Sequence, residues 1–311
     1  MALLWVLLAT IGALANAAFY IIVKKYIKIL DPKILTAAGF IFGALLLFSL
    51  SALQGFPSIG PDYYPAVAIS ALLNIVGLTL IFSALSSSDL SLSMPMLSFT
   101  PAFLVGTSYL LLNEVPSFLG IAGICIIVSG SYVLNISAEH EHFLDPVTSM
   151  LRNRGSWYML IVAFLFAASI NYDKIAMLNS DPVFGMGFTL LIIGSAFILL
   201  SAFPIIRCWR HRWGSIPPVG ERLYSLVFTR RACLPYFIPA VLVAFFVAVE
   251  SISINIAYTL QIVPYVIAIK RLSIIFMVLY GTIACREGEL ANRFIGAAIM
   301  VSGAVIILLF A

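Results

Sequence analysis

The sequence predicts an all-α membrane protein with ten transmembrane helices, and three observations support this class. Of the 311 residues, 62% are hydrophobic and only 10% are charged, and the mean hydropathy is +1.11. Soluble domains carry about 25% charged residues, so the surface of this chain is suited to lipid rather than to water. The apolar runs are long and do not alternate with polar residues, which excludes a transmembrane β-barrel.

Ten apolar runs are each close to the roughly 20 residues that a helix needs to cross a bilayer. The predicted spans cover residues 3–23, 34–53, 66–85, 90–112, 118–136, 157–176, 183–203, 234–257, 263–284 and 291–310. Prolines fall in the gaps between the runs, as at Pro57, Pro116 and Pro182, where a broken backbone is tolerated. The first run has no basic segment before it and is too long for a signal peptide.

Basic residues concentrate in the loops on one face of this predicted bundle. Fourteen of the seventeen basic residues lie there: Lys24, Lys25, Lys28, Lys33, Arg152, Arg154, Arg207, Arg210, Arg212, Arg222, Arg230, Arg231, Arg286 and Arg293. Lys174 is predicted in a loop on the opposite face, and Lys270 and Arg271 remain inside the ninth run. The positive-inside rule therefore places the basic loops in the cytoplasm and both termini outside.

The longest basic loop, residues 204–233, also contains Trp209 and Trp213. Aromatic and cationic residues together favour contact with anionic lipid headgroups. The alternative is that the charge of this loop acts as a topology signal alone.

The chain repeats itself in two blocks of constant spacing. The matches are Asp31-Pro32 with Asp181-Pro182 and Lys24 with Lys174 at an offset of 150, and Glu114 with Glu287, Gly123 with Gly296 and Ser129-Gly130 with Ser302-Gly303 at an offset of 173. We therefore expect a first five-helix repeat at 1–136, a connecting loop at 137–156 and a second repeat at 157–311, into which the basic loop 204–233 is inserted. Because each half holds an odd number of helices, the second half enters the membrane inverted, as in secondary transporters that bind substrate near the midplane.

Two segments in matching positions of the halves resemble a known superfamily. They are "DLSLSMPMLSFTPAFLVGTSYLLLNEVPSFLGIAGICIIVSGSYVL", residues 89–134, and "AIKRLSIIFMVLYGTIACREGELANRFIGAAIMVSGAVIIL", residues 268–308. Each resembles the fourth helix, terminal acidic residue and glycine-rich fifth helix of the drug/metabolite transporter superfamily, in its EamA-like ten-helix branch. The resemblance implies export or import of small organic metabolites, amino acids, nucleotide sugars or phosphorylated sugars. It also implies cytoplasmic termini, which is opposite to the orientation that the charge bias predicts.

Polar side chains inside apolar runs are candidates for substrate contact, because each must be paired or must face water. The predicted substrate-binding residues are Lys270, Arg271, Glu250, Asn16, Asn74, Asn255 and Tyr172. Lys270 lies about 9 Å past Pro264 and Glu250 roughly 16 Å back from Gln261, so they can meet. Neighbouring helical residues point about 100° apart, so we expect Lys270 and Arg271 to face different surroundings.

Other interpretations of these charges remain open. The Lys270-Arg271 pair is similar to a basic pair of the sugar-phosphate translocator branch, and that resemblance implies binding of an anionic group. Alternatively the two side chains reach the membrane interface, or a salt bridge to Glu250 merely fixes the packing. Glu250 could also carry a proton, although a nearby cation favours its ionised form. Glu114 and Glu287 are expected to anchor helix ends.

The sequence thus predicts a secondary-active or facilitative transporter of a small organic metabolite that carries an anionic group, such as an amino acid. The alternatives are a membrane-embedded enzyme and a non-transporting scaffold. Neither a catalytic motif nor metal-ligand spacing is present, so we expect no enzymatic activity, no cofactor and no metal. The expected partners are the substrate and the lipid bilayer, with no nucleic acid, and a monomer suffices. We expect a multi-pass protein of a prokaryotic plasma membrane.

The charge bias makes a testable prediction about orientation. Trypsin added to inside-out membrane vesicles is expected to cut the basic loop 204–233, and right-side-out vesicles are expected to protect it, because the positive-inside rule puts this loop in the cytoplasm. Cleavage from the outer side alone would instead support the orientation that the family resemblance implies.

Overall fold

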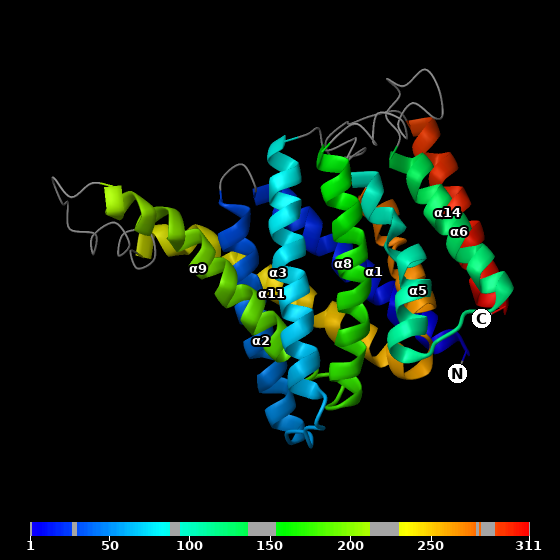
Figure 1. The fold of residues 1–311 in the computed structure, drawn as a ribbon, viewed down its shortest axis with the longest axis horizontal. Coiled ribbons are helices and arrows are strands. Elements are labelled where there is room, and N and C mark those ends of the chain that lie inside the picture. Colours follow the sequence, from blue (N-terminus) through cyan, green and yellow to red (C-terminus); the bar gives the residue numbers. More distant parts are fainter. Residues whose placement is uncertain are drawn as a thin grey trace.

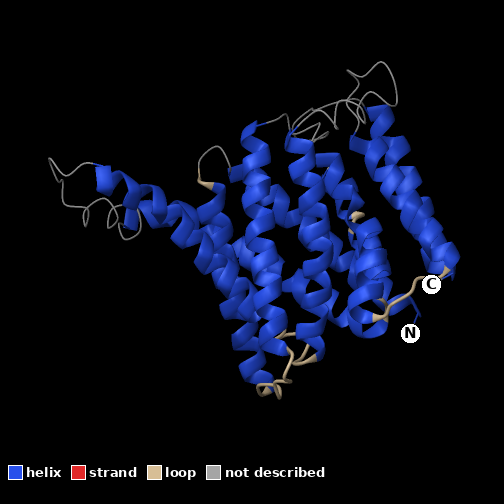
Figure 2. Ribbon diagram, in the orientation of Figure 1, coloured by secondary structure: helices blue, strands red, loops and turns tan. Residues whose placement is uncertain are grey.

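In the computed structural model, the described residues are 2–26, 30–87, 94–135, 154–211, 230–277, 280 and 290–310, and their regular structure is helical (Figure 2). The elements are α1 (Ala2–Tyr26), α2 (Pro32–Gln54), α3 (Tyr63–Ser87), η1 (Met94–Phe99), α5 (Thr100–Leu112), α6 (Phe118–Asn135), α8 (Arg154–Leu178), α9 (Gly187–His211), α11 (Arg230–Leu260), α12 (Val263–Lys270) and α14 (Leu290–Phe310). Five of them, α1, α2, α3, α8 and α11, are individually long and apolar enough to cross a membrane.

These elements correspond to the ten predicted spans, but two spans are interrupted. The fourth consists of the 3₁₀ helix η1 followed by α5, and Pro101 lies in the first turn of α5. The ninth ends its first part at Lys270, and residues 273–277 are again helical. Both predicted spans, at 90–112 and 263–284, are therefore divided within the residues that the structure describes. At the second interruption, tight i to i+3 hydrogen bonds replace the α-helical pattern, as from the Leu272 N–H to the Ile269 carbonyl at 2.9 Å.

Lys174 also differs from its prediction. It lies within α8 rather than in a loop, and its side chain is buried. The apolar run that we placed at 157–176 continues as helix to Leu178, because Lys174 and Asp173 both find polar partners inside the bundle.

Helices from the two halves of the chain lie against one another. α6 packs along α14, α3 along α8, α1 along α11, and α2 along both α9 and α11. Figure 1 shows the α6–α14 pair at one edge of the bundle, and both chain termini on the same face of the molecule.

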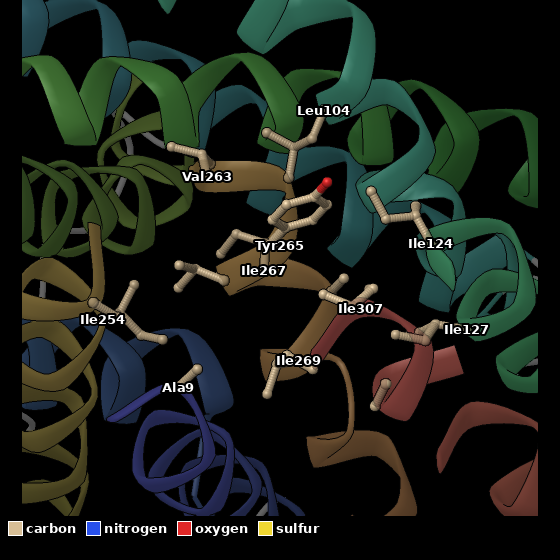
Figure 3. Close-up of a cluster of buried hydrophobic side chains, with 14 of the residues drawn as sticks. Ala9, Leu104, Ile124, Ile127, Ile254, Val263, Tyr265, Ile267, Ile269 and Ile307 are labelled. Carbon is tan, nitrogen blue, oxygen red and sulfur yellow. The ribbon is translucent and has the colours of Figure 1, made fainter. Parts of the chain in front are cut away.

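The short helix α12 lies at the centre of the apolar core. Its residues Val263 to Ile269 are all buried, and it contacts α1, α5, α6, α8, α11 and α14. Figure 3 shows Tyr265, Ile267 and Ile269 of α12 among side chains from neighbouring helices, including Leu104 of α5 and Ile307 of α14. Because α12 is apolar on every side, packing fixes the position of the charged residues at its end.

Glycines allow α6 and α14 to approach backbone to backbone. A Cβ atom added to Gly303 would lie 2.7 Å from the Gly123 carbonyl oxygen and 2.9 Å from the Ile127 nitrogen. A Cβ atom on Gly130 would lie 2.8 Å from the Gly296 carbonyl oxygen. Small residues at helix interfaces are the main route to close packing in lipid, where apolar side chains gain little from leaving the solvent.

Gly303→Ala is expected to destabilise the protein by roughly 1–3 kcal/mol, because the new methyl group meets backbone atoms that cannot rotate away. The measurement is the unfolding midpoint of the purified protein in mixed detergent micelles. Gly106→Ala is the matched control, since nothing lies within 4 Å of a Cβ atom at this exposed helical position. Equal stability of Gly303→Ala and the wild type would contradict the close packing of α6 and α14.

Candidate functional site

The centre of the candidate site is an ion pair between two helices of the second half. Glu250 on α11 and Lys270 at the end of α12 are joined by a 2.5 Å contact between Oε1 and Nζ. Asn16 on α1 donates from Nδ2 to both carboxylate oxygens of Glu250, at 3.1 and 3.2 Å. The Lys270 and Glu250 side chains are 23% and 16% exposed, so the pair is not sealed inside the bundle. Residues from both halves of the chain therefore meet at one partly accessible charged group.

Arg271 adds a second positive charge beside this pair. Its side chain is half-buried, and within the described part of the chain no side-chain hydrogen bond or ion pair involves it. Arg271 and Tyr20 of α1 both lie within electrostatic range of Glu250. One carboxylate thus faces two cations, which leaves the cluster of Asn16, Glu250, Lys270 and Arg271 with a surplus positive charge. We refer to these four residues as the charged cluster.

The charged cluster lies well inside the bundle. The chain rises about 10.5 Å from Val263 to Lys270 along α12, which is about a third of a hydrocarbon core of about 30 Å. At this end of α12 the Ile267 and Ile269 carbonyls accept hydrogen bonds from the Arg271 and Leu272 N–H groups, at 3.0 and 2.9 Å. Interrupted helices with ionisable groups at the break are typical of transporter binding sites.

Three of the predicted site residues lie elsewhere. Asn74 on α3 donates to the Ser169 hydroxyl of α8 at 2.5 Å and to the Ser70 carbonyl at 3.0 Å. Asn255 donates to the Pro182 carbonyl at 2.9 Å. Tyr172 packs partly buried against an aromatic cluster that contains Phe184. The structure therefore brings Asn16, Glu250, Lys270 and Arg271 together but does not bring these three to them.

Two acidic side chains outside the predicted substrate-binding set also lie between helices, Asp173 buried and Glu114 partly buried. Asp173 on α8 accepts a hydrogen bond from the Ser70 hydroxyl of α3. Glu114, which follows α5, accepts from Lys174 at 2.5 Å and from the Val263 N–H at 2.8 Å. Glu114 thus holds the first turn of α12, and its predicted role as a helix anchor is confirmed.

The fold and the buried charges define the class of a multi-pass helical membrane protein. Residues 3–136, which are the first predicted repeat, match the model of the EamA-like transporter family. None of the curated proteins matches the sequence.

A solved structure described as "Crystal structure of protein" superimposes with a TM-score of 0.71. It shares 16% sequence identity, and the alignment covers 99% of this chain and 97% of that chain. At this identity the likeness shows the fold alone, and it extends that fold over both halves.

A double-mutant cycle tests the central ion pair. Glu250→Gln and Lys270→Met are each expected to lower stability, and the double variant is expected to lose less than the sum by about 0.5–3 kcal/mol, because the partners interact directly. The measurement is the unfolding midpoint in detergent. The control is the double variant Glu250→Gln with Lys174→Met. Its effects on stability are expected to add, because Lys174 pairs with Glu114 and not with Glu250. Strict additivity of the Glu250 and Lys270 variants would contradict the pairing.

Proposed function

We propose that this protein is an alternating-access transporter, secondary-active or facilitative, of a small organic metabolite that carries an anionic group. The proposed substrate-binding residues are Lys270 and Arg271, with Glu250 and Asn16 holding Lys270 in position. The family supports membrane transport as the general activity. The substrate class rests on the charged cluster.

The observation that carries the substrate class is the unmatched positive charge of Arg271. A purely structural ion pair would need one cation for Glu250, and Lys270 already supplies it. The guanidinium of Arg271 has no acidic partner among the described residues, in a setting where an unpaired charge is costly. Its planar fork matches the two oxygens of a carboxylate or phosphate. An anion bound there would neutralise the surplus charge.

Alternating access requires two halves that can exchange roles, and the packing pattern supports this proposal. In the proposed repeat α1, α2, α3 and α6 correspond to α8, α9, α11 and α14. The contact between α1 and α11 then corresponds to the contact between α8 and α3, and the α6–α14 and α2–α9 contacts each join two corresponding helices. The two interrupted spans also agree, because Phe99 at the end of η1 and Leu272 after α12 lie at the repeat offset of 173. We therefore propose an inverted pair of five-helix repeats, at 1–136 and 157–311.

Local capping supports the same repeat. Asp31 accepts a hydrogen bond from the Lys33 N–H at 2.8 Å, and Asp181 accepts one from the Val183 N–H at 2.7 Å. Both donors and both acceptors are related by the offset of 150. A shared capping geometry at a helix-entry turn is expected when two segments descend from one duplicated unit.

The scaffold alternative predicts that Glu250 is fully bridged, and Glu250 is indeed bonded to Lys270 and Asn16. The scaffold alternative does not explain the second positive charge, on Arg271, beside the ion pair, and it does not explain why the ion pair is partly exposed. The enzyme alternative needs a nucleophile with a base or a metal centre. In the parts of the chain that the structure describes, there is no group of three or more metal-ligating residues.

The transport proposal predicts that Lys270→Ala and Arg271→Ala each lower exchange of anionic metabolites by roughly tenfold or more, because each removes a charge-assisted contact. The measurement is exchange of a panel of amino acids, carboxylates and phosphate esters in proteoliposomes. Lys25→Ala, an exposed lysine of α1 outside the cluster, is the control. Arg271→Lys is expected to recover part of the activity, since it keeps the charge but loses the fork.

Wild-type rates in both alanine variants for every transported compound would overturn the site assignment. Transport confined to neutral compounds would overturn the anionic substrate class.

A further inference from the structure

A second polar cluster, outside the charged cluster, lies between α3 and α8. It consists of Ser70 and Asn74 on α3 and Ser169 and Asp173 on α8. Asp173 is only 9% exposed, and Ser70 and Ser169 are buried as well. A carboxylate at this position is costly, because burial in a membrane bundle disfavours an unpaired charge.

The hydrogen bonds in this cluster run in one direction. Ser70 has one hydroxyl proton and donates it to Asp173 Oδ1, so the 3.0 Å contact with Ser169 is donated by Ser169. Asn74 Nδ2 in turn donates to the Ser169 hydroxyl at 2.5 Å. The chain of donors therefore ends on one oxygen of Asp173. A proton on the other oxygen, Oδ2, leaves every one of these bonds intact, so the cluster accommodates both protonation states.

The charged groups around Asp173 are already committed to other partners. On α8 itself, Lys174 pairs with Glu114. From α12, Lys270 acts on Asp173 electrostatically but is in contact with Glu250. From α11, Tyr258 lies within electrostatic range of Asp173. The polar groups that α3 and α5 present to α8 are neutral: Ser70, Asn74, Thr107 and Ser108.

Glu250 and Asp173 thus differ in a way that separates their roles. Glu250 contacts the Lys270 ammonium and accepts two further hydrogen bonds from Asn16. Asp173 accepts only a hydroxyl donor and contacts no cation within ion-pair distance among the described residues. Of the two acids, Asp173 is the one that the surroundings allow to be neutral.

We propose that Asp173 is the proton-binding site of this transporter, and that a proton bound there favours an anion at Lys270 and Arg271. The step is a simple proton transfer, in which the Asp173 carboxylate takes a proton from water on one side and returns it to water on the other. Protonation removes a negative charge that acts on Lys270, and so strengthens the attraction of Lys270 for an anion. The coupling, which rests on the proposed function, therefore moves a proton and an anion in the same direction.

The proton site is tested without any substrate, by infrared difference spectroscopy of the purified full-length protein in lipid nanodiscs as the pH is changed. The wild type is expected to show the C=O band of a buried carboxylic acid that appears as the pH falls. Asp173→Asn is expected to lose this band, and its amide oxygen can still accept from Ser70, so the fold is retained. Glu250→Gln and Glu114→Gln are the controls, and both are expected to keep the band.

Two outcomes would overturn the proton site. In the first, the band persists in Asp173→Asn or disappears in Glu250→Gln. In the second, no band titrates, and sodium chloride stabilises the wild type but not Asp173→Asn relative to choline chloride, which would make the cluster a sodium site.

The coupling is tested in proteoliposomes with the same panel of anions. An imposed gradient, acidic on the side of the added anion, is expected to accelerate uptake by the wild type severalfold and to leave Asp173→Asn unaffected. Equal acceleration in both would overturn the coupling through Asp173. Absence of transport by the wild type would overturn the proposed function, and the infrared result would still decide the proton site.

Discussion

The hydrocarbon core of a bilayer supplies no water, so a charge placed there is costly unless a partner satisfies it. Glu250, Lys270 and Asn16 meet this constraint by coming from three helices, α11, α12 and α1. The arrangement of those helices is therefore tied to one ion pair. The same constraint acts at Glu114, which satisfies both Lys174 and the free N–H of Val263 at the other end of α12.

α12 is held by chemistry at both ends and by packing between them. Glu114 binds its first turn, the charged cluster forms at its last, and seven consecutive residues between are buried. A helix that is apolar on every side cannot rotate without moving all of its neighbours. A ligand that draws Lys270 away from Glu250 would thus act on a rigid element that touches both halves of the bundle.

The sequence predicted the spans well and the polar contacts unevenly, for physical reasons. Long apolar runs determine a membrane helix by themselves, and the depth of Glu250 and Lys270 sufficed to predict that they could meet. The interruption after Lys270 could not be seen, because Arg271 and Leu272 are compatible with a continuing helix. Asn74, Asn255 and Tyr172 lie away from the charged cluster, because polarity within a run does not reveal which neighbour a side chain faces. Lys174 was assigned to a loop because its partner, Glu114, is distant in sequence.

The glycine contacts between α6 and α14 have a consequence for how this sequence can change over time. Each glycine borders the backbone of the opposite helix, so a larger residue on either side is opposed by atoms that no rotamer change can move. Substitutions in α6 and α14, which are about half of the chain apart, are therefore coupled through the contact of their backbones. A larger residue is tolerated in one helix only as far as the main chain of the other allows.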